Sequence, residues 1–155
     1  KNPLVIYDRG VVSRKNLELS REKDWHCITG LTIQGQLKNK VIKYEKSDSM
    51  MSFENRVELP QSSYYVISEN YEHCGISGKL LICLNNQLRL KTRESRHDEI
   101  AHAQKQLSEK NRIKDGLKKY FDSNNEVILS KIKEAELLDG FSCLFCTNRT
   151  LPKHL

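Results

Sequence analysis

Long apolar runs are missing from this 155-residue chain, so we expect no membrane-spanning helix. No signal-peptide pattern opens the sequence, and neither an internal repeat nor a low-complexity tract interrupts it. Hydrophobic residues make up 37 % of the chain and charged residues 30 %, which is typical of a polar globular domain. We therefore expect a soluble cytoplasmic protein, as one domain or as part of a larger one. The first residue is Lys1 rather than methionine, which indicates a processed product or an excised piece.

Several common site motifs are also missing. The sequence contains no P-loop, no G-x-G-x-x-G and no G-x-S-x-G, so it predicts neither a glycine-rich phosphate loop nor a nucleophile elbow. What the chain does have is an excess of basic residues, 26 Lys and Arg against 20 Asp and Glu, with a net charge of +6. This excess favours polyanionic partners such as nucleic acid. Many basic proteins bind no nucleic acid, so charge alone leaves both interpretations open.

The five cysteines are an odd number, which favours free thiols in a reducing compartment. Cys143 and Cys146 form a C-x-x-C pair, and a small zinc-binding or redox protein is one interpretation that metal analysis would test. A zinc site needs a second pair of ligands, and His73 with Cys74 is the only candidate, although adjacent residues suit this role poorly. We predict buried free cysteines and no zinc site.

The first thirty residues follow a strand–helix–strand pattern. Residues 4–7 (LVIY) are a continuous apolar run, as in a strand covered on both faces. Ser13 can cap a helix over residues 14–23, and residues 25–30 (WHCITG) predict a second strand, parallel to the first. Farther on, residues 31–60 mix helical and turn signals, and we expect a helix near 36–46. Residues 62–68 and 78–85 predict two strands joined as a hairpin.

A helical pattern then replaces the strand pattern. Apolar residues at helical spacing predict a long charged helix near residues 90–121 and a second helix near 126–138, followed by a final strand in FSCLFCTN. Arg93, Arg96 and Lys105 lie on the basic side of the long helix. Such a face is either solvated or in contact with DNA phosphates, and the spacing is compatible with both.

Asp8 is the first candidate for chemistry, because it directly follows the predicted strand 4–7. Open α/β sheets bind ligands at the carboxyl ends of their strands, and two or three carboxylates there bind Mg²⁺ or Mn²⁺. A turn carboxylate is the alternative role of Asp8. Asp139 is a second candidate, although turn chemistry explains an Asp-Gly pair well.

The stretch LVIYDRGVVSRKNL, with DGFSCLFCTN far downstream, resembles DDE insertion-sequence transposases. The matching residues of the first motif are Asp8, Arg9, Gly10, Ser13, Asn16 and Leu17. The resemblance implies an α/β fold with an RNase H-like core, a D-D-E triad, two Mg²⁺ or Mn²⁺ ions, and cleavage and joining of DNA strands at element ends. It also implies a dimer assembled on those DNA ends.

The resemblance divides the chain into three parts. Residues 1–30 correspond to part of the RNase H-like core, residues 31–138 to an inserted strand and helix segment, and residues 139–155 to a strand returning to the core. Asp8 corresponds to the second aspartate of the triad, a catalytic residue and metal ligand, while the other two carboxylates are expected outside this chain.

By the same resemblance, Arg9, Arg93, Arg96 and Lys105 are candidate DNA contacts. For Arg9 the alternative, which the sequence favours, is a salt bridge that orients the end of the strand. One carboxylate cannot hold two Mg²⁺ ions, so we expect this piece to be inactive although the intact protein is a transposase. The alternative is a non-catalytic nucleic-acid-binding remnant or module.

Overall fold

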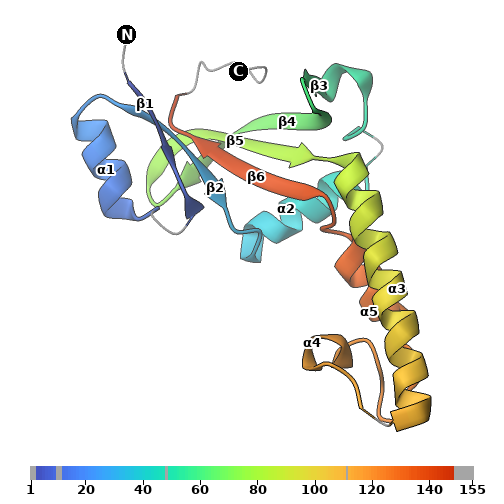
Figure 1. Cartoon of the computed structure of the whole chain (residues 1–155). Helices are drawn as coiled ribbons and strands as arrows, with labels where there is room; N and C mark the ends of the chain where they lie inside the picture. Colours follow the sequence, from blue (N-terminus) through green and yellow to red (C-terminus); the bar gives the residue numbers. More distant parts are fainter. Residues whose placement is uncertain (1–2, 10–11, 48, 111, 149–155) are drawn as a thin grey trace. The chain divides into compact units, whose positions relative to one another are not determined.

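The computed structural model describes residues 3–9, 12–47, 49–110 and 112–148, and it has a mixed α/β fold (Figure 1). The strands are β1 (Leu4–Tyr7), β2 (His26–Leu31), β3 (Arg56–Leu59), β4 (Ser62–His73), β5 (Ile76–Leu84) and β6 (Phe141–Cys146). The helices in the described residues are α1 (Arg14–Glu22), α2 (Gly35–Glu45), the long α3 (Asn86–Lys110), α4 (Asp115–Lys118) and α5 (Leu129–Glu136), with a 3₁₀ turn at Phe53–Asn55. None of these helices is long and apolar enough to cross a membrane.

The chain divides into two compact units. The first unit comprises Lys1–Asn85 and Phe141–Leu155, and the second comprises Asn86–Gly140. Strands β4 and β5 therefore share a unit with β1 and β2, although the resemblance assigns them to an inserted segment. The boundaries of that inserted segment stay a prediction.

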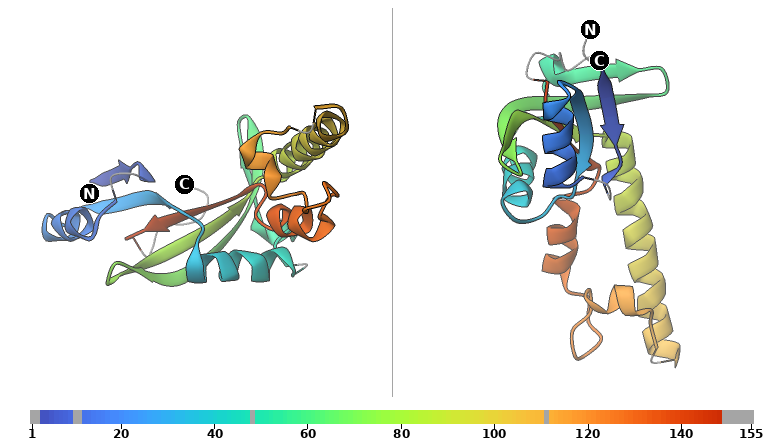
Figure 2. Two further views of the ribbon diagram at one scale, coloured as in Figure 1. Left: turned by 90° about the horizontal axis from the view of Figure 1, so that it is seen from below. Right: turned by 90° about the vertical axis from the view of Figure 1, so that its left-hand side faces the viewer.

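All six strands of the first unit form one curled mixed sheet in the order β1-β2-β6-β5-β4-β3 (Figure 2). The predicted parallel pairing of the first two strands is confirmed, with Leu4 opposite His26 and Tyr7 opposite Thr29. Every other neighbouring pair is antiparallel. The predicted hairpin is also confirmed, and its strands meet at Cys74 and Gly75, whose φ angles of 53° and 78° suit a tight two-residue turn.

One face of this sheet carries the main core of the first unit. The register places Tyr7, Thr29, Phe145, Leu80 and Glu69 in one row across five strands, so their side chains share a face. Helix α1 reaches this face through a 2.8 Å hydrogen bond between the Tyr7 and Ser20 hydroxyls. Helix α2 reaches it through Tyr44, which donates a 2.9 Å hydrogen bond to Glu69.

The opposite face holds a smaller apolar cluster. Val57, Val66 and Cys83 are buried there, and Leu81 and Leu144 pack against them. Toward the β1 edge this face continues with Leu4 and Ile6, which are 48 % and 77 % exposed. Strand β1 was predicted to be covered on both faces, so its exposed side chains are a departure from the sequence pattern.

The second unit is helical and has a core of its own. Ile100 and Ala103 of α3 are buried against Tyr120 and Phe121, with apolar residues of α5 packed around them. The long helix ends at Lys110, earlier than the predicted end near residue 121. A straight helix that continued to Tyr120 would place this residue about 30 Å from Ile100, whereas the two residues share one core. The helical spacing of apolar residues continues past Lys110 in the sequence because apolar residues of 112–121 pack against the same core.

Candidate functional site

Asp8 lies directly after β1, at the carboxyl end of that strand, and its side chain is exposed. Its Oδ1 accepts a 2.6 Å hydrogen bond from the backbone N–H of Arg9. A carboxylate offers about four acceptor positions, so this one bond leaves capacity for a further ligand. The predicted position of Asp8, at the carboxyl end of the first strand, is confirmed.

The segment after Asp8 leads into a well-capped helix. Gly10 and Val11, which belong to the motif stretch, lie outside the described residues. Ser13 has extended backbone, and its side-chain oxygen accepts a 3.2 Å hydrogen bond from the backbone N–H of Asn16. This cap satisfies one of the unpaired N–H groups at the start of α1 and confirms the predicted start of the helix. Leu17 follows in the first turn and is fully buried.

Arg9 lies across the end of the neighbouring strand. A Cβ atom added to Gly30 of β2 would stand 2.9 Å from Cγ and 3.0 Å from Nε of Arg9, so the arginine stem occupies the space left by the missing side chain. The two residues also line a cavity of about 320 Å³ together with Gln34, Tyr71 and His73. Arg9 is exposed, as a residue that contacts phosphate must be.

This Arg9 cavity is polar on several sides. Gln34 and Gln36 bring side-chain amides from the start of α2, and Tyr71 brings a phenol from β4. Burial lowers the pKa of His73, which favours a neutral imidazole that tilts over Phe145 with 5.5 Å between ring centroids. One cation and several neutral hydrogen-bonding groups suit a polar or anionic ligand.

Asp8 fits the role of one metal ligand and cannot form a metal site by itself. Mg²⁺ and Mn²⁺ prefer carboxylate oxygens, and the exposed Asp8 carboxylate can supply them. Within the described residues, however, no group of three or more His, Cys, Asp or Glu side chains is placed to hold a metal ion. A two-metal centre at Asp8 therefore requires carboxylates from elsewhere.

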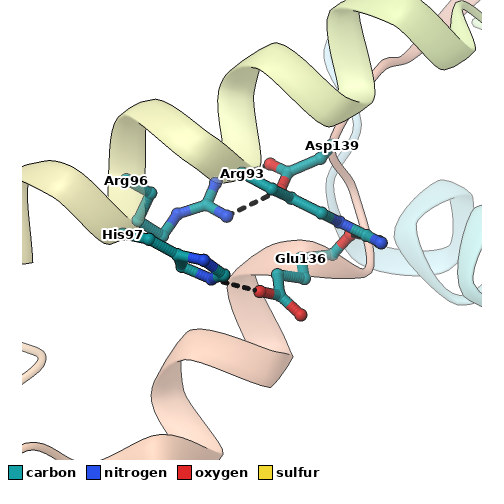
Figure 3. Close-up of polar contacts among 5 residues, drawn as sticks. All are labelled: Arg93, Arg96, His97, Glu136 and Asp139. Carbon is teal, nitrogen blue, oxygen red and sulfur yellow. Dashed lines mark hydrogen bonds and ion pairs between the residues drawn. The ribbon is translucent and has the colours of Figure 1, made fainter.

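Arg93 and Arg96, two of the predicted DNA contacts, are engaged within the second unit (Figure 3). Arg96 donates two hydrogen bonds of 2.6 Å to Asp139, which is only 7 % exposed. Arg93 donates a 2.9 Å hydrogen bond to the carbonyl oxygen of Glu136, in the last turn of α5. Hydrogen bonding to Asp139 raises the pKa of Arg96 further above its ordinary value. These two guanidinium groups are thus bound to protein acceptors.

The neighbouring residues of the long helix differ in their surroundings. His97 lies 2.9 Å from Glu136, from Nε2 to Oε1, and like Arg93 it contacts the last residue of α5 (Figure 3). Lys105, the remaining predicted DNA contact on α3, is exposed. Of the four predicted DNA contacts, Arg9 belongs to the first unit, as does Asp8, and the three residues of α3 belong to the second unit.

The C-x-x-C pair lies within β6, where side chains alternate between faces. Cys143 and Cys146 are three residues apart and therefore point to opposite faces of the sheet, so they cannot bind one zinc ion together. Burial raises the pKa of Cys143 to about 12 and that of Cys83 to about 11. Four of the five thiols are buried and Cys74 is exposed.

The downstream motif DGFSCLFCTN has three residues with structural roles, of which Asp139 was predicted as a turn residue or a second candidate for chemistry and the others only as turn or strand. Asp139 binds Arg96, and Gly140 has a φ angle of 75°, which glycine adopts easily. Thr147 donates its backbone N–H to the Cys27 carbonyl at 3.0 Å, and its Oγ1 accepts the Cys27 N–H at 2.9 Å. The repeated arginines and the isolated acid at 139 were the only sequence signals for the first pairing. No local signal pointed to the second.

The chain was compared with known protein families, curated proteins and solved structures. No protein-family model, no curated protein and no solved structure matches the chain.

Proposed function

We propose that the chain is the central part of a DDE-type insertion-sequence transposase, in which Asp8 is the second metal-binding aspartate. The observation that carries this proposal is an exposed carboxylate at the carboxyl end of β1, which runs parallel to β2 and connects to it through a capped helix. This edge is where α/β sheets hold their ligands. The motif residues Ser13 and Leu17 support the proposal because they fix the start and the packing of that helix.

The finer fold assignment is part of the same proposal. Strands β1 and β2 with α1 are proposed to belong to an RNase H-like core, β3 to β5 and the other helices to the inserted segment, and β6 to the strand that returns to the core. The exposed Leu4 and Ile6 on β1 support the view that further parts of a larger protein cover this edge. The missing two carboxylates are proposed to come from such parts, on an additional strand and an additional helix.

In this proposal Asp8 would be one of the residues that hold Mg²⁺ or Mn²⁺, and the metal would supply an activated water and charge stabilisation at the phosphate that is cut. Asp8 holds metal, and its hydrogen bond from the Arg9 backbone restricts the carboxylate's rotation. The Arg9 side chain, supported by Gly30, is proposed to contact a DNA phosphate near the cut. The protein is proposed to act as a dimer on paired DNA ends.

A nicking assay on the 155-residue chain tests the metal requirement. We expect no Mn²⁺-dependent nicking of supercoiled plasmid, because Asp8 alone cannot hold two ions. Robust nicking that Asp8→Ala abolishes and Asp98→Ala preserves would show that the chain carries a complete metal site, contrary to the proposal. The neighbouring coding sequence gives a second test: the proposal requires an upstream strand ending in Asp and a downstream helix carrying Glu.

A non-catalytic nucleic-acid-binding remnant is the alternative, and the basic charge of the chain supports it equally. Stop codons or frameshifts on both sides of the coding sequence would favour it over the transposase.

A further inference from the structure

A shallow hollow in the second unit is lined by lysines from two separate segments. Lys91 comes from α3, while Lys114 and Lys119 flank α4 on its two sides. The hollow has a volume of about 610 Å³. We call it the lysine hollow, defined by these three residues.

The charge of the lysine hollow is positive and is only partly compensated. Within the described part of the second unit, Lys91, Lys114 and Lys119 make no ion pair; Lys119 lies over the Tyr120 ring at 5.0 Å. Arg96 also lines the hollow, but Asp139 neutralises it, and Glu99 is the one carboxylate in the lining. Three lysines against one glutamate leave a local excess of two positive charges.

The surroundings of the lysine hollow favour the backbone of a duplex over a single strand. Single strands are held by stacking bases on exposed aromatic rings. The aromatic residues of the second unit are Tyr120 and Phe121, and they are only 5 % and 8 % exposed because they form its core. Lysine is a compact point charge that suits phosphate without reading a base. The three lysines are thus suited to phosphate contacts that do not depend on the base sequence.

We infer that the lysine hollow binds the phosphate backbone of double-stranded DNA, independently of sequence, through Lys91, Lys114 and Lys119. The choice of DNA as the polyanion rests on the proposed function, and the inference deepens it by naming a contact surface on the second unit. It also replaces Arg93 and Arg96 as DNA contacts, since both guanidinium groups are bound to the end of α5 and to Asp139.

Salt dependence of binding gives the decisive measurement. The affinity of the 155-residue chain for a random-sequence duplex is measured from 50 to 200 mM salt. Each phosphate contact adds about 0.9 to the slope of log affinity against log salt, so three contacts account for about 2.7, or an affinity loss of about 40-fold over this range. We expect Lys91→Ala/Lys114→Ala/Lys119→Ala to remove that part of the slope, and the corresponding triple Arg variant to retain it.

A control of equal charge separates a local site from net charge. Lys43, Lys46 and Lys133 are exposed and lie outside the lysine hollow. Their triple Ala variant is expected to keep the wild-type slope to within about 0.9, which is the contribution of one phosphate contact. Equal loss of slope in both triple variants contradicts the inference, as does absence of duplex binding by the wild-type chain at 50 mM salt.

A binding experiment with lipid vesicles tests whether the lysine hollow binds an anionic membrane surface instead of DNA. Leu88 and Leu90 are 52 % and 54 % exposed beside Lys91, as in a segment that inserts into a membrane surface. Binding to vesicles of phosphatidylcholine and phosphatidylserine that requires the three lysines, with duplex binding unchanged in the triple variant, overturns the inference. The transposase proposal is tested separately, by the nicking assay and by the neighbouring coding sequence, and neither depends on the lysine hollow.

Discussion

Arg96 of α3 holds both carboxylate oxygens of Asp139, 43 residues later in the chain, through two hydrogen bonds of 2.6 Å each. The side chains are only 14 % and 6 % exposed. A planar guanidinium matches a carboxylate in this paired geometry, so the contact fixes orientation as well as distance. It joins the long helix to the segment that follows α5 within the second unit, and it gives the Asp of the Asp-Gly motif a structural role.

Asp139→Asn is expected to destabilise the chain by about 3 kcal/mol, because it leaves the Arg96 charge buried without its counter-ion. Urea unfolding followed by circular dichroism measures this loss. The control is Glu134→Gln, which breaks the Lys131 pair whose two side chains are each 54 % exposed, and it should cost less than about 0.5 kcal/mol. Equal, small losses in both variants would refute the structural role.

Glu69 is expected to make stability depend on pH in the acid range. Burial raises its pKa, but the Lys40 ammonium at 2.6 Å and the Tyr44 hydroxyl at 2.9 Å together bring the pKa below its ordinary value of 4.5. A lowered pKa in the folded state stabilises the fold above the unfolded-state value, and this stabilisation is lost as the pH falls through the folded-state value.

The wild-type chain should therefore exceed Glu69→Gln in stability by about 1–2 kcal/mol at pH 6, and the difference should shrink below pH 4.5. Urea midpoints at several pH values between 6 and 3 measure it. Glu72→Gln, at an exposed position on the same strand, is the control and should show a much smaller difference. A Glu69→Gln difference that stays constant down to pH 3 is incompatible with the ion pair described.

Three glycines are expected to tolerate alanine very differently. At Gly78 the new Cβ would meet the Cys146 carbonyl oxygen at 2.3 Å, in the backbone of the adjacent strand, so a loss of about 3 kcal/mol or more is expected. At Gly30 it would meet the flexible stem of Arg9 at 2.9 Å, and a loss of about 1 kcal/mol is expected.

Gly116 completes the glycine series, because a Cβ there meets nothing within 4 Å. Alanine should be neutral or stabilising by about 0.5 kcal/mol in this helical position. Thermal melting of the three single variants gives the order. Adding Arg9→Ala to Gly30→Ala should reduce the loss of stability, whereas adding it to Gly78→Ala should not. An unchanged loss in the Gly30→Ala/Arg9→Ala double variant would show that Arg9 is not the obstructing group.

Cys74 is expected to react with iodoacetamide long before the other four cysteines. It is exposed, while burial holds the thiols of Cys83 and Cys143 in the unreactive protonated form. Mass spectrometry of the native chain at pH 8 should find one rapid modification, at Cys74. Rapid labelling of Cys143 and Cys146, suppressed by added zinc, would instead support a metal-binding pair.

Local signals in the sequence predicted the individual elements well. Four consecutive apolar residues, the Ser13 cap and the following strand pattern identified β1, α1 and β2, because caps and hydrophobic periodicity act within a few residues. The hairpin was predicted from the two β-rich runs 62–68 and 78–85 on either side of Gly75. In the structure both strands extend beyond these runs toward the turn, so that His73 pairs with Ile76. Asp8 was found because its position depends only on where β1 ends.

Relationships between distant segments were not predictable in the same way. Nothing in the residues of β6 states that this last strand lies between β2 and β5, since many antiparallel registers would satisfy its pattern. Arg93 and Arg96 had the sequence character of a solvated or DNA-binding face, and only the fold brings Asp139 beside them. The short β3 was missed because its four residues, RVEL, carry too little periodicity.

The most direct test of the central proposal is strand cleavage by the protein encoded by the uninterrupted reading frame around these residues. With Mg²⁺ or Mn²⁺ and DNA carrying the element's ends, Asp8→Asn is expected to reduce cleavage about a thousandfold, equivalent to ~4 kcal/mol, while duplex binding persists. The matched control, Asp98→Asn, removes the same charge from an exposed position on α3 and should cleave normally. Full cleavage by Asp8→Asn would contradict the assignment of Asp8 as a metal ligand.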